Sequence, residues 1–159
     1  MDEEDAIIRG IGQVCIAASL LEWSLAYLTS VLWRKGDSWF VDVFSTPGRT
    51  LPTFGKFIRS LAVLAPDLHP PAGEIKARAD GLLMQRNRVV HSVMVGELEP
   101  GSRVFEAWHA KSDIIWPVSA ADLTRLVAEL DQCTAQADDF GAKWEERAAR
   151  ERWSDPDES

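Results

Sequence analysis

Residues 119–144 read SAADLTRLVAELDQCTAQADDFGAKW, and apolar residues recur in this stretch at steps of three and four. That spacing is typical of one face of an amphipathic α-helix. Ser119 and Asp122 form a capping-box pattern at its start. The stretch therefore predicts a long helix that packs through one continuous seam, whose members are Leu123, Leu126, Leu130, Cys133, Ala137, Phe140 and Trp144.

The same periodicity predicts three further helices upstream, over about 5–34, 52–66 and 72–91. The apolar face of the first is expected to begin at Ile8, and that of the second to end at Leu64. Residues 36–49 are expected to form a loop whose aromatic side chains pack against the core. The prolines within 66–71 are expected to separate the second and third helices, because proline interrupts a helix interior.

After His91 the apolar pattern changes from helical to alternating, which is typical of strands. Three short strands are expected over 93–98, 104–108 and 114–116, with a turn at 99–102 and the last strand ending at Pro117. The sequence thus predicts a mainly α fold, an antiparallel bundle of four long helices with a small β-hairpin or meander between the third and fourth. We expect one domain over residues 1–153 and a disordered acidic tail over 154–159.

The composition is that of an ordinary soluble domain, with 46% hydrophobic and 26% charged residues. Cys15 and Cys133 both fall on apolar helical faces, which favours free thiols in a reducing cytoplasm. The N-terminus is acidic, whereas a secretory signal would be basic. Residues 14–33 are long enough to cross a bilayer, but Glu22 lies near their centre, so we expect a core helix and no membrane partner.

The net charge of −8 is unevenly distributed along the chain. Between Trp33 and Ser92 there are nine Lys and Arg residues against five Asp and Glu, whereas both ends are acidic. Salt screens charges that are more than about 8 Å apart, so a locally basic middle can still attract a polyanion at short range. RNA is therefore compatible with the charge pattern as a partner, and DNA binding is not expected.

The third helix ends in QRNRVVHS at residues 85–92, in which Arg86 is followed by Asn87 and, five residues after the arginine, by His91. This segment resembles the signature of the HEPN superfamily, which is an arginine, a polar residue, a short and largely apolar run, and a histidine. HEPN domains are helical bundles that carry the motif on a late helix, as expected for this chain. The resemblance covers about residues 7–144, and only the motif itself is specific.

The resemblance implies a metal-independent endoribonuclease, used as a toxin or in antiviral defence and active as a dimer. In such an enzyme the RNA 2′-hydroxyl attacks the adjacent phosphate, which requires a base, an acid and positive charge near the phosphate. Histidine side chains titrate at about pH 6.5 and suit either proton transfer, and arginine has a planar fork that matches phosphate oxygens. We expect Arg86, Asn87 and His91 in the active site, with Asn87 orienting His91 or donating to the substrate, and no metal or cofactor.

Helical geometry constrains this site. At about 100° per residue, Asn87 and His91 share a face of the helix, whereas Arg86 and His91 are about 140° apart. One helix therefore does not easily bring Arg86 and His91 to one phosphate. Two copies packed across a two-fold axis can do so, and the resemblance to HEPN domains implies such a homodimer, with a composite site at its interface.

Other residues are candidates for supporting roles. Glu22 is the only charged residue between Gly10 and Arg34, and it is expected either to orient Arg86 or His91 or to form a structural ion pair. Trp108 or Trp116 is a candidate for stacking on a base. Four basic residues are expected either to contact the RNA backbone or to be ordinary solvated charges, namely Arg88, Arg59, Lys56 and Arg49.

Two further hypotheses remain open. The chain is alternatively a non-catalytic HEPN-like domain that binds a nucleotide or a protein, or an antitoxin or immunity partner, as its acidic ends suggest. As a toxin, it would have an antitoxin or another product of a neighbouring gene as its partner. HEPN toxins paired with nucleotidyltransferase antitoxins carry a tyrosine two residues after the histidine. Here that residue is Val93, and the sole tyrosine is Tyr27, so regulation through such a tyrosine is not expected.

Overall fold

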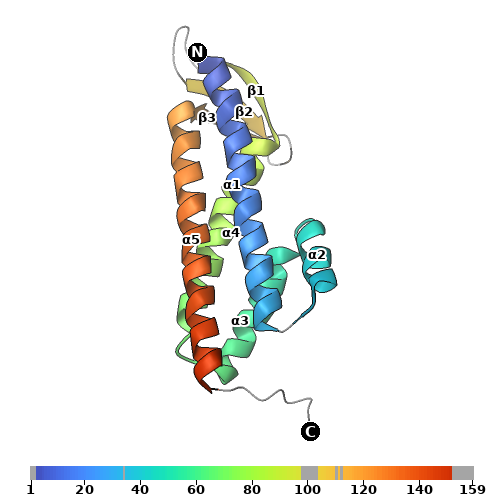
Figure 1. Cartoon of the computed structure of the whole chain (residues 1–159). Helices are drawn as coiled ribbons and strands as arrows, with labels where there is room; N and C mark the ends of the chain where they lie inside the picture. The colour runs from blue at the N-terminus through green and yellow to red at the C-terminus, as the bar shows by residue number, and fades with distance from the viewer. Residues whose placement is uncertain (1–2, 34, 98–103, 110, 112, 152–159) are drawn as a thin grey trace. The chain divides into compact units, whose positions relative to one another are not determined.

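The computed structural model describes residues 3–33, 35–97, 104–109, 111 and 113–151, and within them the chain is mainly helical (Figure 1). Its helices and strands are α1 (Glu3–Leu32), α2 (Asp37–Ser45), α3 (Thr50–Leu64), α4 (His69–Val90), β1 (Ser92–Glu97), β2 (Val104–His109), β3 (Ile114–Ser119) and α5 (Ala120–Glu151). The mainly α class and the small antiparallel sheet are confirmed. The HEPN arrangement of the helices stays a prediction.

Contacts between residues divide the chain into two compact units. The first comprises Met1–Glu22 with Ala77–Cys133, and the second comprises Trp23–Lys76 with Thr134–Ser159. Helices α1, α4 and α5 each contribute residues to both units. The single domain expected over 1–153 stays a prediction, and the tail expected at 154–159 lies outside the described residues.

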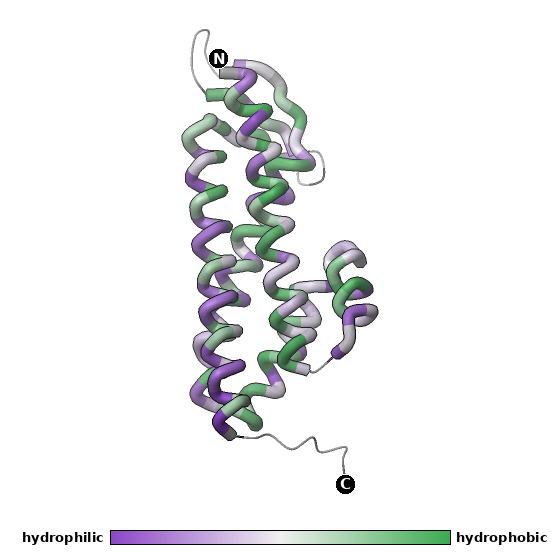
Figure 2. Tube along the Cα trace, in the orientation of Figure 1, coloured by the Kyte–Doolittle hydropathy of each residue, from purple (hydrophilic) through white to green (hydrophobic). Residues whose placement is uncertain are grey.

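Helix α5 has the amphipathic pattern that the sequence predicts. Hydrophilic and hydrophobic segments alternate along it (Figure 2). All seven residues of the expected seam are buried, and the most exposed of them, Trp144, is 8% exposed. Burial of this seam is therefore the main reason that the segment is helical, since a helix of this kind gains most of its stability from packing.

The first unit contains the start of α1, the end of α4, the start of α5 and the sheet. Its core is aliphatic, and its most buried side chains include Ile7, Val14, Leu21, Ala79, Leu123 and Leu130. The prediction for Ile8 was wrong, because this residue is 61% exposed whereas Ile7 is 1% exposed. The buried face of α1 thus begins one residue earlier, at the position seven residues before Val14.

The sheet lies where α4 ends and α5 begins (Figure 1). Its strand order is β1-β2-β3 and both pairings are antiparallel, so the expected meander is confirmed. Ala107 and Val118 are buried on one face, whereas Trp108 and its cross-strand partner Ile115 are exposed on the other. One side of the sheet therefore packs on the helices of this unit.

Strand β3 runs to Ser119, so its expected end at Pro117 was wrong. Pro117 pairs with Glu106 of β2, and β3 has no neighbour on its other side among the described strands. An edge strand tolerates a residue without an N–H, which explains why the proline does not end it. The turn expected at 99–102 lies outside the described residues.

Helices α1 and α5 approach each other closely at Gly10. A Cβ atom at this position would lie 2.9 Å from Leu123 Cδ1 and 3.0 Å from Leu123 Cβ. The contact with Cβ is not relieved by rotating the leucine side chain, so a larger residue would push the helices apart. At Gly12, two residues further along α1, an added Cβ would have no neighbour within 4 Å.

Alanine at these two glycines is expected to change stability in opposite directions. Gly10→Ala should lower the free energy of unfolding by about 1–3 kcal/mol, because it overpacks the contact with Leu123. Gly12→Ala should raise it by about 0.5–1 kcal/mol, because alanine loses less backbone entropy than glycine in a helix. Urea unfolding followed by circular dichroism measures both changes. An equal gain in stability for the two variants would contradict the close approach.

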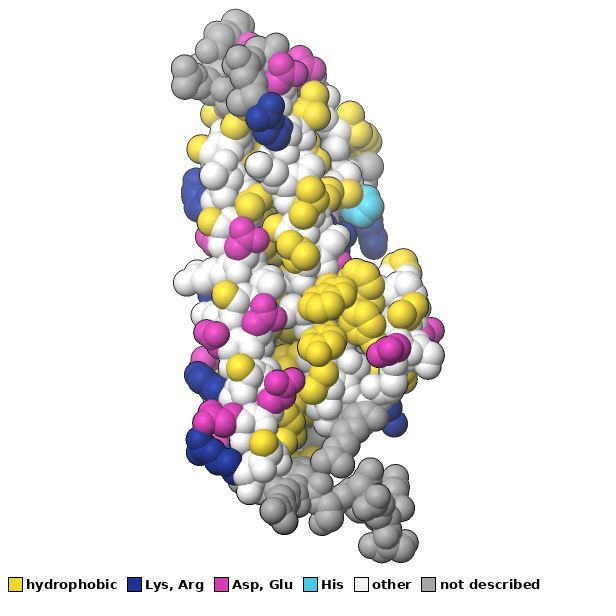
Figure 3. Space-filling model, in the orientation of Figure 1, with side chains coloured by type: hydrophobic (Ala, Val, Ile, Leu, Met, Phe, Trp, Pro, Cys, Tyr) yellow, Lys and Arg dark blue, Asp and Glu magenta, His cyan; other side chains and the backbone are white. Residues whose placement is uncertain are grey.

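The second unit contains the end of α1, helices α2 and α3, the start of α4 and the end of α5. Phe57 lies in its core and contacts Trp33 and Trp144 edge-on, with ring centroids 6.0 and 6.2 Å apart. Hydrophobic side chains also gather on the surface over α1 and α2 (Figure 3). The expected burial of Leu64 was wrong, because this last residue of α3 is 49% exposed.

Helix α2 replaces the loop that was expected between the first two long helices. The backbone N–H groups of Trp39 and Phe40 both donate to the carbonyl oxygen of Gly36, at 3.0 and 3.2 Å. Phe40 stacks on Phe44 with ring centroids 6.0 Å apart, and Val43 is fully buried. The apolar spacing of 40, 43 and 44 is helical, but three residues are too few to separate a short helix from a packed loop.

Helix α4 begins at His69, although its prolines were expected to belong to a loop. Pro70 and Pro71 lie in its first turn, where backbone N–H groups have no helical acceptor, so proline loses nothing there. The N–H of Ala72 donates to Leu68 at 3.2 Å and starts the helical pattern. Asp67, just before the helix, accepts two hydrogen bonds from Arg147 of α5, which hold the pKa of its carboxyl below the ordinary value.

Helix α1 is, among the described residues, the one helix long and apolar enough to cross a membrane by length and composition. Of its most apolar stretch, 56% is buried inside the protein. The core helix of a soluble protein has the same properties, and this burial is compatible with a soluble protein.

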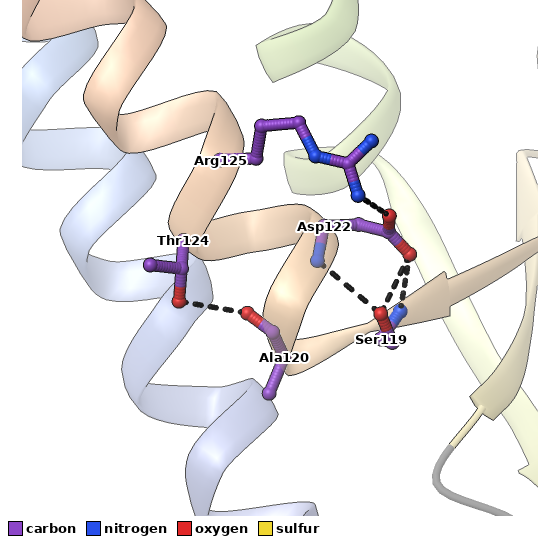
Figure 4. A network of polar contacts seen from close by, with 5 residues as sticks. All are labelled: Ser119, Ala120, Asp122, Thr124 and Arg125. Carbon is purple, nitrogen blue, oxygen red and sulfur yellow. Dashed lines mark hydrogen bonds and ion pairs between the residues drawn. The ribbon is translucent and has the colours of Figure 1, made fainter.

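The capping box expected at the start of α5 is confirmed (Figure 4). The backbone N–H of Asp122 donates to the Ser119 hydroxyl oxygen at 3.2 Å. In return, the Asp122 carboxylate accepts from the Ser119 backbone N–H at 3.1 Å and from its hydroxyl at 2.7 Å. Arg125 adds an ion pair to the same carboxylate at 2.8 Å. The box therefore joins the end of β3 to the first turn of α5.

Removing this cap is expected to destabilise the protein. Ser119→Ala should lower the free energy of unfolding by about 0.5–2 kcal/mol, because an N–H of the first helical turn loses its acceptor. Urea unfolding measures the change. Ser19→Ala, at an exposed position of α1, is the matched control and should change stability by less than about 0.5 kcal/mol. A similar change in both variants would mean that the hydroxyl of Ser119 has no capping role.

Candidate active site

The motif residues lie where α4 ends and β1 begins. Arg86 and Asn87 are in the last turns of α4, and His91 directly follows it. The backbone N–H of His91 donates to the carbonyl oxygen of Asn87 at 3.0 Å, so the helical pattern continues to the histidine. Asn87 and His91 are both exposed and lie one turn apart, as neighbours on the helix surface.

Arg86 faces the other way, towards α1. Its Nη2 atom lies 2.9 Å from Oε2 of Glu22, and the two side chains are only 23% and 26% exposed. The pairing of Glu22 with Arg86 is common to the catalytic and the structural interpretations of these residues. The Nε atom of Arg86 is buried and has no hydrogen-bond partner among the described residues.

The motif is thus divided between two sides of α4. Arg86 is held against α1, whereas Asn87 and His91 are exposed. Within the described part of the chain, the His91 imidazole has no hydrogen bond or ion pair. Its nitrogens are therefore available to a substrate, and its removal breaks no hydrogen bond or ion pair with the described residues.

Exposed apolar side chains surround the motif. Met84 lies on the same face of α4 as Asn87 and His91 and is 54% exposed. Val90 is 38% exposed, and Val93 on β1 is 59% exposed. Apolar groups clustered on a surface in this way are typical of a site that binds another molecule.

A pocket of about 210 Å³ lies between α4, β3 and α5, and the α4 residues that line it are next to the motif in sequence but do not include Arg86, Asn87 or His91. Gln85 and Arg88 line it from α4, and Trp116 lines it from β3. The Trp116 indole N–H donates to the Ser92 hydroxyl oxygen at 3.3 Å, and that hydroxyl donates in turn to the Arg88 carbonyl. Ser92 therefore fixes Trp116 next to the last turn of α4. Trp116 and Arg88 are both candidates from the sequence, but their positions in the chain give no reason to place them together.

The other candidates for RNA binding belong to the second unit. Lys56 and Arg59 are exposed on α3, and Arg49 forms an ion pair with Asp42. Arg88 is the member of this set that lies in the same unit as the motif. Contacts of all four with RNA stay a prediction.

The described part of the chain contains neither a reactive cysteine nor a cluster of metal-ligating residues that would form an alternative site. Cys15 and Cys133 are free, and burial raises the pKa of the Cys133 thiol, which keeps it protonated and unreactive at neutral pH. The described residues hold no group of three or more metal-ligating side chains. The motif at the end of α4 is therefore the candidate that the chemistry of the described residues supports best.

Comparison with known proteins found no match to the chain among family models, curated proteins or solved structures. The described residues define a mainly α protein with a small antiparallel sheet and an exposed histidine at the end of its fourth helix. The chemistry of these residues is therefore the basis for a proposed function.

Proposed function

We propose that the chain is a metal-independent endoribonuclease of the HEPN type, acting in the cytoplasm as a homodimer with a toxin or defence role. The observation that supports this most is that Asn87 and His91 are exposed together on one side of α4, whereas Arg86 faces another side, towards α1. A second copy would add its own α4 end to this surface. An arginine of one protomer and a histidine of the other would then reach the same phosphate.

In the proposed reaction, the imidazole of His91 makes one of the two proton transfers, either accepting the proton of the RNA 2′-hydroxyl or donating one to the departing 5′-oxygen, and a water molecule makes the other. The 2′-oxygen bonds to phosphorus, and the bond from phosphorus to the 5′-oxygen breaks. The products are a 2′,3′-cyclic phosphate and a 5′-hydroxyl. Arg86 stabilises the charge on the phosphate through its guanidinium, and Asn87 orients the histidine or the substrate.

The pocket beside the motif suits one base of a single-stranded RNA. Its volume of about 210 Å³ is below the range of roughly 300–1,000 Å³ typical of pockets for drug-sized ligands. Trp116 offers an aromatic surface for stacking. Arg88 is three residues before His91 and hence its neighbour on the helix surface, where it can contact the adjoining phosphate.

The exposed apolar residues around the motif support the dimer. Met84, Val90 and Val93 would be covered when a second copy packs over the end of α4. Burying them would add a hydrophobic contribution to association. The same contact would exclude water from the phosphate, where charge interactions would then be stronger.

The experiment that tests the proposal measures RNA cleavage in EDTA at increasing protein concentration, with sedimentation velocity over the same range. We expect cleavage per protomer to rise in step with the fraction of dimer, because the site is composite. Constant activity per protomer across the transition from monomer to dimer would contradict the composite site. Absence of cleavage by a folded dimer would contradict the enzyme itself.

A non-catalytic HEPN-like domain that binds a nucleotide or a protein is the second candidate. Two observations favour it: Arg86 already has a carboxylate partner, and the chain has a net charge of −8. This candidate predicts that a folded dimer binds a nucleotide or co-purifies with a partner, and that RNA stays intact. Cleavage in the same assay would exclude it.

A further inference from the structure

A second pocket lies in the second unit, between the end of α1 and the end of α5, and the proposed ribonuclease reaction does not use it. Its volume is about 380 Å³, within the range of roughly 300–1,000 Å³ typical of ligand pockets. Its two walls differ in chemistry. The wall from α1 is aromatic, and the wall from α5 is acidic.

The aromatic residues of the α1 wall are Trp23 and Tyr27, which are four residues apart, and Ser24, Leu28 and Val31 complete this wall. Their rings stack nearly in parallel, with centroids 5.2 Å apart, and the residues are 43% and 48% exposed. Phe40 of α2 meets both rings edge-on, at 5.9 and 6.2 Å, and fixes their orientation. Figure 3 shows these elements covered by hydrophobic side chains, with acidic side chains along α5 beside them.

The acidic wall consists of Asp138 and Glu145, which are seven residues apart and share a face of α5. Asp138 accepts a hydrogen bond from the Ser24 hydroxyl. Within the described ranges, neither carboxylate has a cation as a partner. Gly141 and Ala142 lie between them, and their small size leaves room for a ligand.

A cation matches both walls at once. Aromatic faces carry negative charge density and attract cations, tryptophan most strongly. Carboxylates favour arginine in particular, because its planar guanidinium can donate two parallel hydrogen bonds while it stacks on a ring. Val41 and Phe44 of α2, which are 56% and 37% exposed, extend the aromatic surface with apolar area.

We propose that this pocket binds an arginine side chain presented by a protein partner, on a segment that also carries apolar residues. The arginine would lie against Trp23 and Tyr27 and pair with Asp138 or Glu145. The apolar residues of the segment would cover the exposed surface of α2. This inference does not depend on the proposed ribonuclease activity, and each can fail without the other.

The test uses N-acetyl-arginine amide as a probe, with the neutral isostere N-acetyl-citrulline amide as its control. Binding is followed by NMR of the full-length protein, through the indole N–H signal of Trp23 as assigned with Trp23→Phe. We expect the arginine compound to shift this signal and the citrulline compound to leave it unchanged. The response to arginine should weaken as salt is added, because the carboxylates are exposed.

Variants of the two walls locate the site. Trp23→Ala should weaken arginine binding by about 2- to 30-fold, as measured through the indole signal of Trp33 or backbone amides of α5. Glu145→Gln should weaken it by up to about fivefold, and Ala142→Leu should weaken it by filling the pocket. Asp139→Asn is the matched control, because it removes the same charge from α5 at an exposed residue that does not line the pocket.

Three outcomes would overturn the proposal. The first is an equal response to the arginine and citrulline compounds. The second is a loss of binding in Asp139→Asn as large as in Glu145→Gln, which would indicate only a general charge effect. The third is the loss of self-association in Trp23→Ala or Glu145→Gln by sedimentation velocity, which would assign the surface to a second copy of the chain.

Discussion

Replacing His91 with alanine is expected to lower the rate of RNA cleavage by about 10²–10⁴-fold, the contribution typical of a general acid or base. The imidazole is exposed and has no polar partner among the described residues, so its loss should leave the fold intact. The free energy of unfolding should therefore change by less than about 0.5 kcal/mol. Cleavage of labelled RNA and urea unfolding, measured on the same preparation, test both parts.

His69→Ala is the matched control for this variant. His69 is the first residue of α4, at the opposite end of the helix from the motif, and belongs to the second unit. It should keep the full rate of cleavage. A His91→Ala protein that is folded and as active as the wild type would remove the histidine from the mechanism.

A mixed dimer of two inactive variants is expected to regain activity. Arg86→Gln removes the positive charge that stabilises the phosphate, and His91→Ala removes the group that transfers the proton, so each homodimer should be inactive. In a dimer with one chain of each kind, the arginine of one protomer still meets the histidine of the other. One of the two composite sites is then complete, and activity should return to roughly half that of the wild type.

Co-expression with two different tags and sequential purification give the mixed dimer without its parents. Thermal unfolding of Arg86→Gln controls for its fold, because this change weakens the ion pair with Glu22. A mixed dimer as inactive as both parents would show that each protomer needs its own arginine and histidine. The composite site would then be wrong, and each active site would lie within one protomer.

Periodicity in the sequence predicts α1, α3, α4 and α5, because each of these helices buries a long apolar face. Periodicity does not predict helix α2, because Val43 is its one fully buried residue and the apolar pattern around it is short. The start of α4 at His69 could not be predicted from periodicity for another reason. A proline in the first turn and a proline that ends a helix look alike in sequence, and the hydrogen bond from Ala72 to Leu68 distinguishes them only in the structure.

The candidate site was predictable where its parts are local. The motif lies within and directly after the last turns of α4. Glu22 was conspicuous as the only charged residue between Gly10 and Arg34, which made its pairing with Arg86 an expected alternative. The pocket beside the motif was not predictable, because it depends on how Ser92 and Trp116 meet across the unit. In the second unit, the aromatic part of the α1–α5 pocket could have been predicted, because Trp23 and Tyr27 do not belong to the buried face of α1 and are therefore exposed aromatic residues.

The central claim is that this protein cleaves RNA through the 2′-hydroxyl, with His91 as the proton-transfer group and without a metal. The most direct measurement incubates purified wild type and His91→Ala with end-labelled RNA in EDTA and determines the new ends by mass spectrometry. The account predicts 2′,3′-cyclic phosphate and 5′-hydroxyl ends with the wild type and intact RNA with the variant. Intact RNA with both proteins as folded dimers, or 3′-hydroxyl and 5′-phosphate ends, would contradict it.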